Sequence, residues 1–394
     1  RPNKALKVAA DMEDWGRVIE VVREHKDTLY TRDYPTTMGD QILARVPEEL
    51  LEEEPQLLRL RSMHHQFAAP RDTPVPASEF TVDEDGGTDP AQLVMRAIEL
   101  RVDGRFTESA QLCDRLVASQ RLDPETPPDD QRDALAFAQV HLGASYLLAG
   151  RDTDAISILR RAFRTAQDGS FIRRDAAGKL ALAYIMLGRP GDAERWREEE
   201  LRYPALPSAT EALVRPAGDV AAALLALERL DLDGAGDILD DLGPPDDREE
   251  FWGFILYARA LLALLRGTPA EGVRSLRTEM LRFTTMRDHG AIVGPLLDAV
   301  AADLRLACGD PEGASELVGA STHPLTAPTR ARTLLLNDEP AAAAALCRQA
   351  LADLRVTTRD AVELDLVAAA AAVACDDPEA GASYLRSAVS VAET

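Results

Sequence analysis

A recurring pair of signals, a turn residue followed five positions later by a small residue, constrains the fold of this chain more than any other feature. In the stretch Leu142–Ala155, one helix ends, the chain turns tightly at Gly150, and a second helix begins with Ala155 inside it. Gly, Asn and Asp tolerate the left-handed backbone that ends a helix. A small side chain allows the second helix to pack closely on the first. The pattern therefore predicts helical hairpins.

The same pair of signals recurs at a mean spacing of about 39 residues, which lies within the range of helical-repeat arrays. The predicted turn residues are Gly104, Gly150, Gly188, Asp231, Gly267, Gly309, Asn337 and Asp376. The small residues that follow them are Ser109, Ala155, Ala193, Gly236, Gly272, Ala314, Ala342 and Gly381. Ala and Leu dominate the composition, and no alternating β-branched run occurs. We therefore predict an all-α fold, a superhelical stack of helical hairpins (an α-solenoid).

The predicted organisation has three parts. Residues 1–67 form N-terminal helical hairpins, the first with its turn at 12–15. Residues 68–90 are rich in Pro, Gly and acidic residues and are expected to be an exposed insertion loop. Residues 91–394 form the repeat superhelix, interrupted by a loop at 123–130 and continuous with residues 1–67 as one solenoid.

Charge and cysteine content narrow the function classes. With 44 Lys and Arg against 67 Asp and Glu, the formal net charge is −23, which argues against direct contact with nucleic acid or an anionic membrane. No signal peptide and no membrane-spanning apolar run is found, so we expect a cytoplasmic protein with reduced thiols. Cys113, Cys347 and Cys375 lie among Leu and Ala and are expected to be buried. The first residue is not Met, and we expect an excised fragment.

The repeats resemble a known family of helical repeats. The stretch around Gly150 fits the tetratricopeptide signature at Leu142, Gly143, Tyr146, Gly150 and Ala155. Gly188 gives a weaker match with Ala181, Tyr184 and Ala193. The other hairpins keep only the turn and the small residue. Residues 90–394 therefore resemble degenerate tetratricopeptide-like repeats.

A narrower resemblance is found near the front of the chain. The segment Arg45–Arg61 resembles one that recurs in the large ATP-binding LuxR-type transcriptional regulators, the class of the maltose-regulon activator. The closing segment Ala380–Glu393 is similar to the last sensor helix of that family. There, a nucleotide-binding STAND ATPase module precedes a helical-repeat sensor, and a helix-turn-helix follows it. The resemblance implies that ATP is bound only by an upstream domain and DNA only by a downstream one, so no cofactor is expected in this chain.

No chemistry-bearing motif is recognised in the sequence. The nearest imitation of a phosphate loop, Ala176–Leu180, lacks the Ser or Thr that should follow Lys179. His64 and His65 are adjacent, so on a helix they point about 100° apart and cannot bind one metal ion together. No nucleophile stands beside a base in a known pattern. We therefore expect no enzyme activity, no catalytic residues and no metal site.

The concave side of the stack is the expected binding surface. In stacked hairpins the first helices line this side, and the tetratricopeptide register places a mostly apolar set of residues on it. The candidate ligand-binding residues are Arg101, Phe137, His141, Lys179, Met186, Phe254 and Tyr257. An apolar wall with few polar groups suits a small organic molecule. Ordinary packing between helices is the alternative for each of these residues.

The leading hypothesis is the effector-sensing, ligand-binding regulatory region of a LuxR-type transcriptional regulator. A small molecule in the concave groove would favour one curvature of the superhelix and so control separate ATP-binding and helix-turn-helix domains in signal transduction. Self-association, or intramolecular contact with those regulatory domains, is a further expectation. The alternatives are a tetratricopeptide-type scaffold that binds a protein or peptide partner, and the repeat region of another signalling ATPase.

Overall fold

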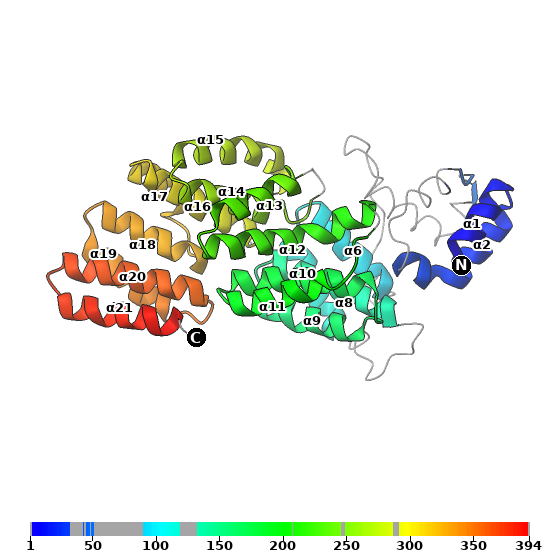
Figure 1. Ribbon diagram of the computed structural model, residues 1–394, viewed down its shortest axis with the longest axis horizontal. Coiled ribbons are helices and arrows are strands. Elements are labelled where there is room, and N and C mark those ends of the chain that lie inside the picture. The colour runs from blue at the N-terminus through cyan, green and yellow to red at the C-terminus, as the bar shows by residue number, and fades with distance from the viewer. Residues whose placement is uncertain are drawn as a thin grey trace.

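The chain is a stack of α-helices in the computed structural model (Figure 1). The structure describes residues 2–31, 42, 45–47, 49–50, 90–118, 132–206, 208–245, 249–286 and 291–392. Within these ranges every regular element is a helix and no strand occurs, which confirms the predicted all-α class. The predicted loop at 68–90 (Pro90 apart), the loop at 123–130 and most of the segment Arg45–Arg61 lie outside the described residues.

The main stack consists of consecutive two-helix hairpins. In chain order they are α6 (Pro90–Val102) with α7 (Phe106–Ala118), α8 (Arg132–Leu148) with α9 (Asp152–Thr165), α10 (Phe171–Met186) with α11 (Pro190–Leu201), α12 (Ser208–Glu228) with α13 (Leu232–Leu242), α14 (Trp252–Leu265) with α15 (Pro269–Met280), α16 (Val293–Ala307) with α17 (Pro311–Val318), α18 (Ala327–Leu336) with α19 (Pro340–Leu351), and α20 (Thr358–Ala374) with α21 (Pro378–Ala392). There are also two 3₁₀ segments: η1 (Leu281–Met286) follows α15, and η2 (Pro324–Thr326) precedes α18. Each helix packs on its hairpin partner, and successive first helices pack on one another. This arrangement is an α-solenoid of helical hairpins.

The N-terminal hairpin has a core of its own. It comprises α1 (Pro2–Asp11) and α2 (Trp15–Thr31), with the predicted turn between them. Val18, Val21 and Val22 of α2 pack with residues of α1 and with Ile42 and Val46. The prediction that residues 1–67 continue the main solenoid stays a prediction.

Most predicted hairpin turns are confirmed. The predicted glycines and Asp376 all have positive φ, between 61° and 77°. The prediction misplaced two turns by one residue. In one turn the left-handed residue is Leu230 (φ 57°), not Asp231, and in the other it is Asp338 (φ 64°), not Asn337. Asp231 instead caps α13, its carboxylate accepting a hydrogen bond of 3.0 Å from Gly234 N–H.

The small residue does lie five positions after the left-handed residue. Counted from Leu230 and Asp338, the position falls on Ala235 and Ala343, and neither is accessible to solvent. The predicted Ala342 is exposed. Seven of the eight predicted small residues are buried, Ala342 being the exception, so the contact between paired helices was correctly inferred.

Close helix packing also explains a glycine of the tetratricopeptide signature. A Cβ on Gly143 of α8 would lie 2.5 Å from Cγ of Leu159 on α9. Real carbon atoms do not approach so closely, so any side chain here would force the two helices apart. The first helices are the more buried members of their pairs. For example, nearly all of α10 is buried, whereas Ala193 and Glu200 are the buried residues of α11.

The superhelix turns far enough for late helices to touch early turns. Ile292, which precedes α16, donates its N–H to the carbonyl of Leu148 at 3.4 Å. A Cβ on Gly188, between α10 and α11, would lie 2.4 Å from the backbone N of Arg359 in the first turn of α20. We call the approach of Gly188 to Arg359 the closing contact. Figure 1 shows the α20–α21 hairpin beside the α10–α11 hairpin.

The cysteine prediction was partly wrong. Cys113 and Cys347 are buried, as expected, but Cys375 and Cys308 are exposed. Both exposed cysteines follow the last residue of a first helix, where the chain turns away from the packed face. The four thiols are free.

Candidate functional site

One part of the concave side is filled by the chain itself. The segment 249–252, which leads into α14, brings Phe251 and Trp252 into the core, where both are almost inaccessible to solvent. Trp252 stacks on Phe283 with a centroid distance of 4.4 Å. Glu250 of the same segment accepts a hydrogen bond from the side chain of Arg101 on α6. We call this part of the concave side the filled region.

Arg101 is the centre of a hydrogen-bond network in the filled region. Its guanidinium donates to the carbonyl of His141 and to Oγ of Ser145, both at 2.8 Å, and to Oε2 of Glu250 at 3.2 Å. It also lies 2.8 Å from Nδ1 of His141, which must accept because a guanidinium only donates. Burial and then the Arg101 charge lower the pKa of His141 well below its ordinary value, so the imidazole is neutral.

Lys179 is held in the same region. Its ammonium pairs with the carboxylate of Asp175 one turn earlier on α10 and lies 5.6 Å from the ring centroid of Phe251. Burial raises the pKa of Asp175, and the Lys179 charge opposes that shift. Both charged side chains are therefore engaged by groups of the protein itself.

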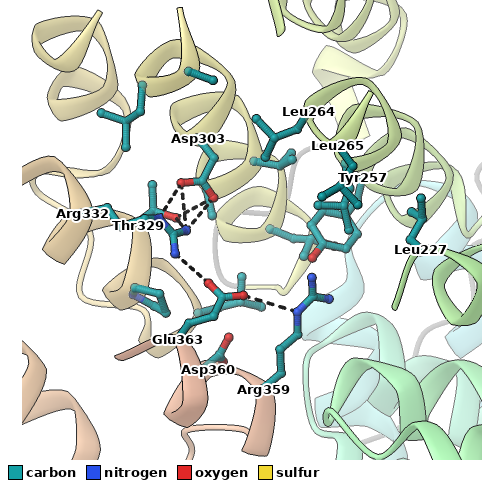
Figure 2. Close-up of a pocket in the computed structure, with 18 of the residues that line it drawn as sticks. Leu227, Tyr257, Leu264, Leu265, Asp303, Thr329, Arg332, Arg359, Asp360 and Glu363 are labelled. Carbon is teal, nitrogen blue, oxygen red and sulfur yellow. Dashed lines mark hydrogen bonds and ion pairs between the residues drawn. The ribbon is translucent and has the colours of Figure 1, made fainter. Parts of the chain in front are cut away.

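The other part of the concave side is an open groove of about 600 Å³ (Figure 2). Its lining comes from α10, α12, α14, α16, α18 and α20, with η2 contributing Leu325. In Figure 2, Leu227, Leu264, Leu265 and Tyr257 lie on one side and the charged groups of α16, α18 and α20 on the other. We call this space the groove. It has an apolar wall facing a polar wall.

The polar wall is built on two arginines. Arg332 of α18 makes a two-pronged contact with Asp303 of α16 at 2.8–3.2 Å and donates to Glu363 of α20 at 2.8 Å. Arg359 lies between Glu228 and Glu363, with N–O distances of 3.4 and 3.5 Å. The Arg332 pairs join the successive first helices α16, α18 and α20, and the pair of Arg359 with Glu228 joins α20 to α12.

Burial shifts the pKa values of the groove carboxyls. It raises the pKa of Asp303, and the neighbouring Arg332 only partly compensates. It raises the pKa of Asp360 to about 6, with a further contribution from the charge of Glu363. Burial also opposes ionisation of Glu363, but Arg332 and Arg359 outweigh it and lower the pKa of that carboxyl. Glu363 is therefore the best-compensated acid in the groove.

Exposed leucines stand at the rim of the groove. Leu230, Leu265 and Leu336 have 69%, 39% and 61% of their surface exposed, and all three line the groove. Leu265 and Leu336 are the last residues of α14 and α18, and Leu230 is the left-handed residue of the turn after α12. We call these three residues the rim leucines.

The predicted site residues are divided between the two regions. Met186 and Tyr257 line the groove, and Leu261, also predicted to face inwards, lines it too. Arg101, His141 and Lys179 belong to the filled region. A ligand-binding role for any of them stays a prediction.

The two predicted phenylalanines pack against aromatic neighbours. Phe137 contacts the His141 ring at a centroid distance of 4.3 Å, and Phe254 is fully buried with Phe251 at 6.3 Å. Packing between helices, the alternative given above, accounts for both placements.

The charged residues of the groove were missed. Asp303, Arg332, Arg359 and Glu363 are charged residues within first helices, and such residues are usually taken to face solvent. One signal was available: Asp303 lies in an otherwise apolar stretch of α16, from Ala299 to Leu304. A charge there must find a partner on a neighbouring helix.

The described part of the chain holds neither a candidate metal site nor a helix that could span a membrane. No group of three His, Cys, Asp or Glu side chains that could hold a metal ion is found there. None of the described helices is both long and apolar enough to cross a bilayer.

Comparisons with known proteins gave matches among solved structures alone. No family model and no curated protein matches this chain. Among solved structures, it is similar to a tetratricopeptide repeat protein from Parabacteroides merdae, with 16% identity, a TM-score of 0.38, and coverage of 71% of this chain and 98% of that one. It is similar to a chain of the APC/C hetero-tetramer Cut9-Hcn1, with 12% identity, a TM-score of 0.47, and coverage of 91% and 74%. The P58(IPK) TPR domain gives 12% identity, a TM-score of 0.24, and coverage of 78% and 98%.

All three TM-scores are below 0.5. The repeat architecture of this chain therefore rests on its own helix pairs, turns and buried small residues.

Proposed function

We propose that this chain is a helical-repeat binding protein that holds a segment of a partner protein in the groove. The rim leucines are the observation that carries the proposal. Exposed apolar side chains gathered around a concave site are typical of protein interaction surfaces. A partner segment that continues past the groove would cover them, whereas a small molecule inside the groove would leave much of their surface in water.

The mixed lining of the groove also supports a peptide-like ligand. Polar groups come from four first helices, with Glu228 on α12, Asp303 on α16, Arg332 on α18 and Glu363 on α20. A peptide offers hydrogen-bonding groups along its whole length, so it can use such a row. Small-molecule sites usually contain few polar groups.

Selection of binding peptides and a matched pair of variants test the proposal. Peptides would be selected from a displayed random library on the purified chain, and their affinities measured by fluorescence anisotropy. The double variant Leu265→Ser and Leu336→Ser removes two rim leucines whose side chains are already partly exposed, so the fold should be kept. We expect the selected peptides to bind it about tenfold or more weakly, as expected when apolar contacts at a binding site are lost.

The control variant is Leu354→Ser. Leu354 is fully exposed after α19 and does not line the groove, so this change should leave affinity unaltered. If no peptide is enriched, or if enriched peptides bind the rim variant as tightly as the unaltered chain, the proposal is wrong.

A second candidate is the small-molecule sensor region of a LuxR-type regulator acting in the cytoplasm. Two observations favour it: the resemblance of Arg45–Arg61 to that family, and a groove volume of about 600 Å³ with an apolar wall, a size typical of small-molecule sites. Thermal-shift measurements against a panel of metabolites would separate the two candidates. Stabilisation by a metabolite, lost in Leu261→Arg, would favour the sensor.

A further inference from the structure

The charges that line the groove do not balance. The carboxylates are those of Glu228, Asp303, Asp360 and Glu363, and the guanidinium groups are those of Arg332 and Arg359. Four acids against two bases leave a formal excess of two negative charges in a partly enclosed space. Such an excess is unfavourable where water is displaced, unless a cation joins it.

Asp360 is the groove acid that neither arginine holds in an ion pair. The charge of Arg359 and hydrogen bonding with Thr357 favour its ionised form, but burial and the charge of Glu363 outweigh them. Asp303 and Glu363 share Arg332, and Glu228 and Glu363 share Arg359. No ion pair joins Asp360 to a basic group among the residues that the structure describes. The burial of this carboxyl, which raises its pKa to about 6, is consistent with a missing cation.

The arginines do not offer a matching site for an acidic ligand. Arg332 already donates to both oxygens of Asp303, to Glu363 and to Oγ of Thr329. Arg359 is held between two carboxylates. An incoming carboxylate would therefore meet guanidinium groups that are already engaged, in surroundings of net negative charge.

We infer that the partner segment inserts a Lys or Arg side chain into the groove beside Asp360, with apolar residues on either side of it. This inference rests on the proposed function and specifies the chemistry of the partner. The methylene stem of a long basic side chain can pack along the wall formed by Leu227, Leu261 and Leu264 while its charged end faces Asp360. The net charge of −23 on the chain would also attract a basic segment from solution.

Pools of synthetic peptides test the inference. Each pool holds capped octapeptides with a central Leu-Xaa-Leu, where Xaa is Lys, Arg, Gln or Glu and the other positions are randomised. We expect the Lys and Arg pools to bind about tenfold more tightly than the Gln pool in anisotropy measurements at low salt, and the Glu pool to bind most weakly. This preference should shrink as salt is added.

A variant pair locates the preference. Asp360→Asn keeps the shape of the side chain but removes its charge, so the ratio of Lys-pool to Gln-pool affinity should fall severalfold while the Gln pool is unaffected. Glu316→Gln removes one charge from the exposed face of α17 and should leave the ratio unchanged. Circular dichroism melting curves check that both variants are folded.

The outcomes separate this inference from the proposed function. Equal binding of all pools, with loss in the rim-leucine variant, would overturn the cationic preference and leave the binding groove standing. A preference that survives in Asp360→Asn would place the cation elsewhere and overturn the inference. Absence of binding by every pool, and of any peptide from selection, would overturn both.

Discussion

The closing contact can be tested by adding a single methyl group. Gly188 has φ +73°, and a Cβ there would lie 2.4 Å from the backbone N of Arg359 and 2.8 Å from its Cβ. Gly267 occupies the same place in another hairpin turn, with φ +74°, and a Cβ there would meet nothing within 4 Å. The two glycines therefore share the backbone conformation and differ in the neighbour.

The expected magnitudes follow from that difference. Gly267→Ala should lower the free energy of unfolding by about 1–2 kcal/mol, the cost of a left-handed L-residue. Gly188→Ala incurs the same cost plus about 1–3 kcal/mol for overpacking against α20, because the obstructing atoms belong to the backbone and cannot rotate away. The difference between the variants isolates the closing contact.

Urea unfolding and native-state hydrogen exchange would measure this difference. We expect Gly188→Ala to be the less stable variant and to speed amide exchange in the first turn of α20, near Arg359. Gly267→Ala should leave exchange in α20 unchanged. Equal loss of stability in the two variants, with α20 equally protected, would refute the closing contact.

Three further outcomes follow from the packing and the buried charges. Ala343→Leu should destabilise the chain by about 1–3 kcal/mol in urea unfolding, while Ala342→Leu should be nearly neutral, because Ala343 is buried and Ala342 is exposed. A larger loss of stability in Ala342→Leu would refute the assignment of Asp338 as the turn residue. Arg101→Met leaves Glu250 without its cation and should cost about 3–5 kcal/mol by the same assay; a change below 1 kcal/mol, on the order of a surface pair, would contradict the network. Burial raises the pKa of Asp152 from 3.8 to about 7, so between these pH values the folded state holds a proton that the unfolded state has lost, and stability should fall as pH rises. Melting temperatures measured against pH should therefore fall less in Asp152→Asn than in the unaltered chain. An equal fall in both would argue against a role for this carboxyl.

The fold was largely predictable because the helix ends and turns depend on the residues at those positions. A glycine at a helix end adopts positive φ at little cost, so turns such as Gly150 and Gly309 can be read from the sequence. Leu230 gave no such signal, because branched side chains seldom adopt this conformation, and the adjacent Asp231 carried the cap chemistry instead. At Asn337–Asp338, two residues of equal suitability stand side by side, and only the packing of Ala343 decides between them.

The site was less predictable because distant segments decide which part of the concave side is open. The tetratricopeptide register put Met186 and Tyr257 on the concave side, and both residues line the groove. It could not show that the segment carrying Glu250 and Phe251 returns to cover Arg101 and Lys179, since nothing near those residues encodes that return.

The closing contact also bears on how the molecule comes apart. In a linear repeat array each unit touches only its neighbours, so terminal units can fray one after another. Here α20 rests on the turn between α10 and α11, and loosening the last hairpins removes support from the middle of the chain. We therefore expect the units from α10 to α21 to melt together, as one cooperative block, and truncation after α19 to weaken helices that it leaves untouched.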